Sequence, residues 1–219
     1  MKWLYLVSAA LIFIKIFLIP HNSDFVNSLP NISFIIEESG VPNAVTGIIF
    51  QNRLYDTLFE VLVFSLAILG AKFILTKEKP LQHVRHVTDE PTKILVRLGA
   101  TITALVSFEL SIRGHLSPGG GFAAGVAGGT AVCLMLITSI ETISIYYDRN
   151  KIALVEKISV ITIILLSTLL LSGIDLPKGE MGTLFSGGLI PVLNSMVGLK
   201  VMLGSWALVR VFVYYRGLL

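Results

Sequence analysis

The sequence contains a single cysteine, Cys133, among its 219 residues. One cysteine excludes an intrachain disulfide and any zinc or iron–sulfur site built from several cysteines. The four histidines, His21, His83, His86 and His115, all fall in predicted loops, and none of them belongs to a metal-ligand or nucleophile pattern. We therefore expect no catalytic residue, no bound metal and no cofactor, and a chain that is not itself an enzyme.

Charge is also scarce, since only 14% of the residues are charged while 54% are hydrophobic. The mean hydropathy is +0.81, which is too apolar for the surface of a water-soluble domain. The formal net charge is +3, but the lysines and arginines flank apolar stretches instead of forming one basic patch. These features predict a chain that lies in a lipid bilayer and does not bind nucleic acid.

Apolar stretches of the length needed to cross a bilayer, about 20 residues each, predict an all-α integral membrane protein of about six transmembrane helices. The predicted spans are residues 3–19, 56–75, 94–112, 121–140, 152–172 and 189–213. The first could also be a signal peptide, but Pro20 and His21 follow it where a cleavage site with small residues would stand. We therefore interpret residues 3–19 as a retained helix. Residues 20–55 are expected to form an external loop, in which the apolar piece 32–36 is too short to span.

The lysines and arginines predict the orientation, because cytoplasmic segments near helix ends carry the positive excess. With both termini inside, only Arg53, Arg113 and Lys178 fall outside. Eleven cations then fall on the inner side: Lys2, Lys72, Lys77, Lys79, Arg85, Lys93, Arg149, Lys151, Lys157, Arg210 and Arg216. This bias favours six helices with the N-terminus and the C-terminus in the cytoplasm.

The most polar stretch divides the chain into two parts. Residues 77–93 are expected to form a cytoplasmic linker between a two-helix module, residues 1–76, and a four-helix domain, residues 94–219. Neither part repeats the other, so the pattern gives no support to an independent transporter built from inverted repeats.

The segment RGHLSPGGGF at residues 113–122 joins the third and fourth predicted spans. Three consecutive glycines permit unusual backbone conformations and close approach of another segment. A phosphate-binding loop is not supported, because Phe122 and Ala123 stand where the Walker pattern needs lysine and serine or threonine. Gly121, Gly125 and Gly129 then recur every fourth residue, which is typical of a helix that packs closely against another membrane helix.

Several charged or titratable side chains are predicted at one depth, in the outer third of the membrane. Asp56 and Glu60 share one face of the second span, and Glu109 lies near the outer end of the third, before Arg113 and His115. One interpretation makes Asp56, Glu60, Glu109 and His115 candidates for a proton or sodium path, with Glu60 and Glu109 as its titratable stations. The other is structural: Glu109 pairs with Arg113 one turn away, and Asp56 caps its helix. The sequence leaves both open.

Lys200 lies near the middle of the last span, too deep to reach either surface easily, so it needs a carboxylate, a carbonyl or a water-filled cavity. Buried lysines can lose their proton, which makes Lys200 a further candidate for the ion path. The alternative is that Lys200 only holds a neighbouring subunit. Lys15 and Arg97 lie nearer the membrane surfaces and are expected to extend to them.

Three segments of the sequence resemble subunits of a known family of membrane complexes. RGHLSPGGGFAAGVAGG at residues 113–129 and IPVLNSMVGLKVMLG at residues 190–204 resemble the B subunit of Mrp-type Na⁺/H⁺ antiporters. VTGIIFQNRLYDTLFEVLVFSLAILGA at residues 45–71 is similar to the module that ends the large A subunit of those antiporters. In membrane-bound hydrogenases a similar module forms a small, separate E-type subunit. Leu54 replaces a glycine of that pattern, whereas its two carboxylates are retained as Asp56 and Glu60.

The resemblance implies a non-catalytic subunit of a multisubunit cation/proton antiporter in the cell membrane, with other membrane subunits as partners and Na⁺ and H⁺ as the ions. The direct joining of the two modules favours a complex coupled to a hydrogenase or another oxidoreductase over a free-standing antiporter. A rival hypothesis is a purely structural assembly subunit with no ion path of its own.

Overall fold

In a computed structural model the described part of the chain, residues 32–81, 87, 89–149 and 151–217, is helical and contains no strand. The chain divides into two compact units, Met1–Phe34 and Ile35–Leu219, and the account below concerns the second. Five of its helices are long and apolar enough to cross a membrane: α4 (Leu54–Leu75), α5 (Glu90–Arg113), α6 (Gly121–Thr138), α8 (Ile152–Leu171) and α9 (Ile190–Arg216). The all-α membrane fold expected from the sequence is confirmed. The first expected span, residues 3–19, lies outside the described residues.

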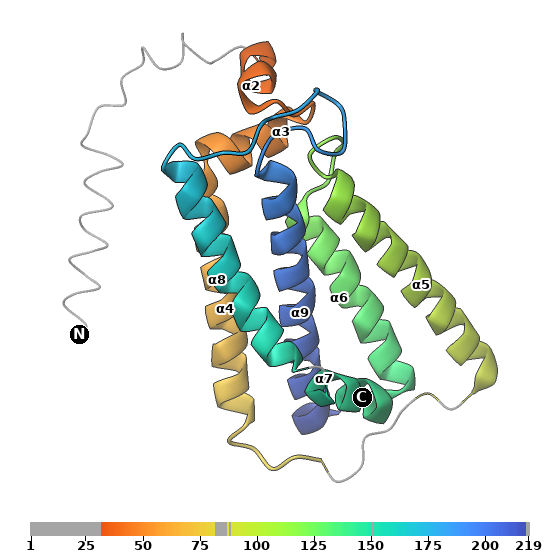
Figure 1. The fold of residues 1–219 in the computed structure, drawn as a ribbon. Coiled ribbons are helices and arrows are strands. Elements are labelled where there is room, and N and C mark those ends of the chain that lie inside the picture. Colours follow the sequence, from red (N-terminus) through yellow and green to blue (C-terminus); the bar gives the residue numbers. More distant parts are fainter. Residues whose placement is uncertain (1–31, 82–86, 88, 150, 218–219) are drawn as a thin grey trace, which may run out of the picture. The chain divides into compact units, whose positions relative to one another are not determined.

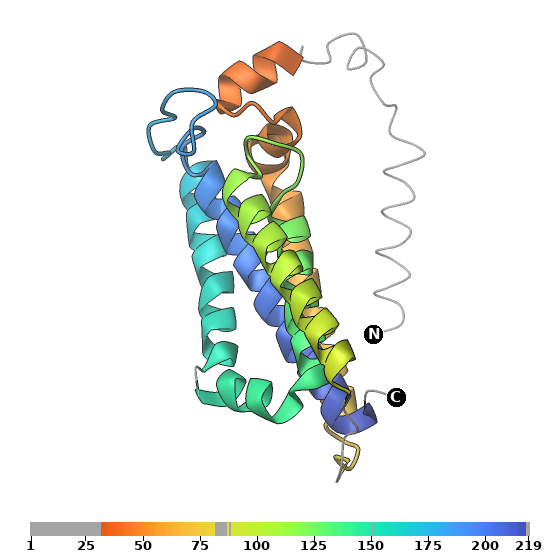
Figure 2. The ribbon, with the colours of Figure 1, turned by 90° about the vertical axis from the view of Figure 1, so that its right-hand side faces the viewer.

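Helix α9 is the centre of the bundle, since α4, α5, α6 and α8 all pack against it (Figure 1). Half of the apolar window of α9 is buried within the chain, whereas only 6% of the window of α5 is buried. Helix α5, which lies in front in Figure 2, packs mainly on α6, and α4 lies on the other side of α9 beside α8 (Figure 1). The outward faces of α4 and α5 are therefore left for lipid or for other protein chains.

The glycines of α6 lie where that helix meets α9. A methyl group added at Gly129 would lie 2.6 Å from Cβ of Ser205, and one at Gly125 would overlap Val201. A methyl group added at Gly121 would likewise overlap the backbone carbonyl oxygen of Asn194. Side chains at these positions would separate the two backbones, so the four-residue glycine spacing explains why α6 and α9 lie so close.

Short helices lie at both ends of the bundle. Helices α2 (Ile32–Ser39) and α3 (Ala44–Gly47) and the π-helical turn η2 (Ile48–Asn52) precede α4 at the end where α9 begins, which we call the α3 end. The predicted apolar piece 32–36 is the first part of α2. At the opposite end, the α7 end, the predicted span 121–140 stops earlier: α6 ends at Thr138, and α7 (Ile140–Arg149) turns aside before α8 begins.

Candidate functional site

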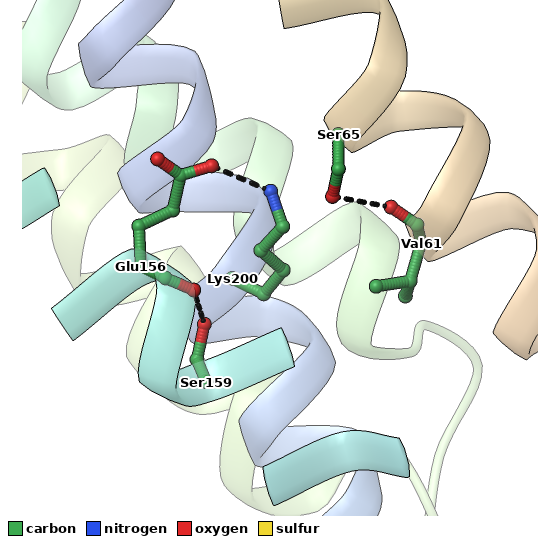
Figure 3. Close-up of polar contacts among 5 residues, drawn as sticks. All are labelled: Val61, Ser65, Glu156, Ser159 and Lys200. Carbon is green, nitrogen blue, oxygen red and sulfur yellow. Dashed lines mark hydrogen bonds and ion pairs between the residues drawn. The ribbon is translucent and has the colours of Figure 1, made fainter. Parts of the chain in front are cut away.

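Lys200 is fully buried in the middle of α9 and forms an ion pair with Glu156 of α8. The Lys200 Nζ lies 2.7 Å from the Glu156 Oε1 (Figure 3). The side chain of Glu156 is 16% exposed and that of Lys200 is not exposed at all. Lys200 is the eleventh residue of α9, about 15 Å along the helix axis at 1.5 Å per residue. A lysine at that depth would be costly without a partner, and Glu156 supplies it.

The wall opposite Glu156 is mostly apolar and comes from α4. The ammonium group of Lys200 lies 5.0 Å from the centre of the Phe64 ring, close enough for a cation–π contact. Gly204, one turn further along α9, leaves the space: a methyl group there would lie 3.2 Å from the Lys200 Nζ and 2.6 Å from Ile68. Any larger residue at this position would displace the lysine or α4.

Two serines border the pair, and each donates its hydroxyl hydrogen to a carbonyl of its own helix. Ser65 donates to Val61, and Ser159 donates to the backbone carbonyl of Glu156, both at 2.7 Å. Neither serine binds the carboxylate or the ammonium group. Lys200 and Glu156 therefore compensate each other's charge, and a proton that neutralises one of them changes the balance of the whole site.

Sequence reasoning missed Glu156, although a signal was present. Glu156 is the fifth residue of α8, so it lies one turn inside a predicted span, and a carboxylate was one of the three partners expected for Lys200, beside a carbonyl and a water-filled cavity. The order of the helices alone does not say which helices touch. The packing of α8 against α9 makes the partner of Lys200 visible.

Asp56 and Glu60 both lie on the exposed surface of the chain, in the first two turns of α4. The carboxylate of Asp56 pairs with the Arg53 guanidinium at 2.5 Å and does not cap the helix. Glu60 forms no ion pair and no side-chain hydrogen bond with any described residue. A bare carboxylate about 9 Å into a span, at 1.5 Å per residue, needs a partner subunit or water against it.

Glu109 forms the short-range pair expected for it, with its Oε1 3.6 Å from a nitrogen of Arg113. Both side chains are more than half exposed on α5. Because α4 and α5 pack on different sides of α9, Glu60 and Glu109 are not brought together. The expected gathering of carboxylates does not form one site within this chain.

His115 lies in the loop between α5 and α6 and is completely buried. Backbone groups of Ile112, Thr183 and Leu184 surround the ring, but neither ring nitrogen has a hydrogen bond of good geometry to a described residue. Burial lowers the pKa of His115, against a smaller opposing effect of that backbone, so the ring is neutral at neutral pH. The predicted ion-path residue is therefore enclosed and does not lie beside Glu109 on the surface.

The loop around His115 is held by the segment before α4. The side-chain amide of Asn43 donates to the carbonyls of Gly114 (2.9 Å) and Ser117 (2.8 Å), and the Thr46 hydroxyl donates to Gly114 (2.9 Å). Asn194 of α9 donates to the carbonyl of Ser111 at 2.7 Å from the other side. The two sequence modules thus share one hydrogen-bonded junction at the α3 end.

The sequence of this chain is similar to that of a known protein family and of one archaeal protein. Residues 91–207 match the family described as a domain related to the MnhB subunit of Na⁺/H⁺ antiporter. An uncharacterized protein of Methanocaldococcus jannaschii is 26% identical over 194 residues, which cover 75% of this chain and 74% of that protein.

Two solved membrane complexes contain similar folds. A chain of the membrane-bound sulfane sulfur reductase, an archaeal respiratory membrane complex, matches with a TM-score of 0.69 and 23% identity, over 98% of this chain and 99% of that chain. A chain of the Mrp complex from a Dietzia species matches with a TM-score of 0.62 and 19% identity, over 99% of this chain and 26% of that longer chain.

Proposed function

This chain belongs to the family of domains related to the MnhB subunit of Na⁺/H⁺ antiporters, and we propose that it is a membrane subunit of a multisubunit Mrp-type cation/proton antiporter module. The family match carries the assignment, because it covers residues 91–207, which include all of α6 and α8, nearly all of α5 and most of α9. Such a subunit acts in company: it performs no catalysis itself and contributes to the movement of sodium ions and protons across the cell membrane.

The buried Lys200–Glu156 pair favours transport over a purely structural role. Two well-packed apolar residues hold helices together as well as a buried ion pair does, and often better. A charged pair in a membrane bundle is costly to keep, and such residues commonly mark ion or proton pathways. The pair also has a titratable carboxylate that is partly exposed, so it can exchange a proton without unfolding the bundle.

The partners are other membrane subunits, and two surfaces support this. Glu60 is bare on the face of α4, and α5 exposes nearly all of its apolar window. The near-complete match in length with a chain of a respiratory complex favours coupling to an oxidoreductase. In the Dietzia Mrp complex the corresponding region is part of a longer chain. A respiratory assembly is therefore the preferred setting, and a free-standing antiporter is the second.

The experiment compares the native complex with one in which the pair is replaced by apolar residues of similar volume, Lys200→Met with Glu156→Leu. The tagged chain is purified with its partners and placed in vesicles, and proton movement driven by a sodium gradient is recorded. We expect the double variant to co-purify in normal amounts, because no buried charge is left unpaired. We expect its sodium-driven proton movement to be lost.

Normal proton movement by the assembled double variant would favour the structural rival. Failure of the tagged native chain to co-purify with any other membrane protein would contradict the assignment as a subunit.

A further inference from the structure

A cavity lies at the corner between α7 and α8, at the α7 end of the bundle. Its volume is about 350 Å³, and Tyr147, Asp148, Lys151, Ile152 and Lys157 are among the residues that line it. Three of its seven lining residues are of charged types, Asp148, Lys151 and Lys157, so water that enters the cavity finds polar groups to bind. The Lys200–Glu156 pair begins one helical turn further along α8, since Glu156 follows Ile152 by four residues.

Tyr147 lines this cavity and belongs to a buried cluster against which Ile152, one helical turn before Glu156, also packs. Its ring is 4% exposed, and its hydroxyl has no hydrogen-bond partner among the described residues. A buried hydroxyl without a partner is costly, which calls for a ligand or water. The ring is fixed from two sides: Trp206 meets it edge-on with the ring centres 5.5 Å apart, and the Arg210 guanidinium lies 4.6 Å from its centre.

The neighbours of Tyr147 are also those of Lys200. Tyr147 packs in one cluster with Ile68 and Ala207, and Phe64 borders that cluster. Phe64 and Ile68 are the residues that also wall the lysine through Gly204. Burial, and after it the negative charge of Glu156, raises the pKa of Tyr147. The hydroxyl therefore remains protonated at neutral pH.

We propose that the Tyr147 hydroxyl relays protons between the cavity at the α7 end and the carboxylate of Glu156. Because the hydroxyl forms no hydrogen bond with Glu156 in this structure, a water between them completes the relay: the phenol donates its hydrogen to that water, the water donates a hydrogen to a carboxylate oxygen, and the phenol oxygen accepts a proton from the water of the cavity. The tyrosine is neutral before and after the step, and Glu156 gains one proton. Release is the reverse. This inference rests on the proposed transport role of the pair and adds the route by which the pair is loaded.

The opposite direction is closed by apolar side chains. Val61, Ile163 and Val197 are each 1% exposed and belong to one buried cluster on the α3 side of the pair. Protons reach Glu156 from the α7 end, while the apolar layer separates the pair from the α3 end in this conformation. A site that opens to one side at a time is what a transporter requires and what an assembly contact does not need.

Other charged side chains lie near Tyr147. Asp148 is held by Arg210 at 2.5 Å, so neither is available to replace the tyrosine. Lys151, just before α8, and Lys157 of α8 are exposed at the cavity, and Lys72 of α4 lies one turn beyond Ile68.

The test uses the whole complex in vesicles with Tyr147→Phe, which removes the hydroxyl and keeps the ring that Trp206 and Arg210 hold. Tyr146→Phe is the matched control, because Tyr146 is the exposed neighbour on the same helix. We expect Tyr147→Phe to assemble normally and to slow sodium-driven proton movement by about tenfold or more, the usual range for a lost proton-transfer group. We expect the control to be unchanged.

Replacement of Tyr147 by 3,5-difluorotyrosine supplies a second readout. The fluorinated phenol keeps its size and hydroxyl but loses its proton more readily, so the alkaline limb of the rate–pH profile should move to lower pH. A role in packing alone would leave that profile unmoved. Normal rates for Tyr147→Phe, with Glu156→Gln inactive, would overturn the relay and keep the proposed function. Normal rates for both would overturn both.

Discussion

Lys200 and Glu156 lie within 2.7 Å of each other inside a bundle that gives neither of them another charged partner among the described residues. The loss of one member therefore differs from the loss of both. An unpaired charge remains in the first case, with a cost of about 3–5 kcal/mol for a buried pair. Nothing charged remains in the second. This difference allows stability and transport to be separated at this site.

We expect Lys200→Ala to reduce both the assembled complex and the sodium-driven proton movement, because the carboxylate of Glu156 loses its counter-charge and a cavity replaces the lysine stem. The amount of tagged chain recovered with its partners measures assembly. Lys79→Ala is the control, since Lys79 is an exposed lysine beyond the end of α4. Full recovery of the Lys200→Ala complex would show that the pair is not needed for folding.

At Glu60 the structure gives no partner, so the expected effect is on transport. We expect Glu60→Gln to assemble and to lose most sodium-dependent proton exchange, because the amide keeps the shape and hydrogen bonding of the carboxylate and removes its charge. Glu37→Gln, an exposed glutamate of α2, is the control. Exchange that stays normal across a range of pH and sodium concentration would remove Glu60 from the ion path.

Among the helix contacts, the one between α6 and α9 depends most clearly on the absence of side chains at the glycines of α6. We expect Gly125→Leu to abolish recovery of the assembled complex, because the added side chain would overlap Val201 and separate the two backbones. Gly70→Leu is the matched control: Gly70 is a glycine within α4 that has no neighbouring atom within 4 Å of an added methyl group. An active, fully assembled Gly125→Leu complex would refute the close-packing account.

The long helices could be predicted from the sequence because apolar length is a local property. Spans predicted at residues 56–75 and 152–172 agree with α4 and α8 within two residues at each end. Helix α7 was missed because its amphipathic turns follow a long apolar run without a glycine or proline to mark the break. Ser139, whose backbone leaves the helical region, supplies that break.

Of the two residues of the candidate site, the sequence could predict Lys200 but not its partner Glu156. The need of Lys200 for a partner follows from depth alone, whereas the identity of Glu156 depends on which helices pack together. Depth also placed Glu60 and Glu109 at one level, yet it could not show that α9 lies between their helices. Local patterns give the level of a residue in the membrane, and lateral packing decides its neighbours.

For the whole molecule, the charge bias predicts that the α7 end faces the cytoplasm and the α3 end faces outside. In a Cys133→Ala background, we expect cysteines at Lys79 and at Met181 to react with a membrane-impermeant reagent from opposite sides. Both positions are exposed, and they flank α4 and α9 at different ends. Labelling of both cysteines from the same side would contradict the topology.

The central claim is that this MnhB-related chain takes part in transport through its buried ion pair. The most direct measurement is sodium-driven proton movement by vesicles containing the assembled complex with Glu156→Gln, beside a Glu180→Gln control in the exposed loop before α9. We expect recovery of the complex to fall less than for Lys200→Ala, because glutamine no longer balances the charge of Lys200 but still accepts a hydrogen bond from its ammonium group. We expect the movement of protons to fall about tenfold or more. Equal rates for the two variants, at equal amounts of assembled complex, would contradict the account.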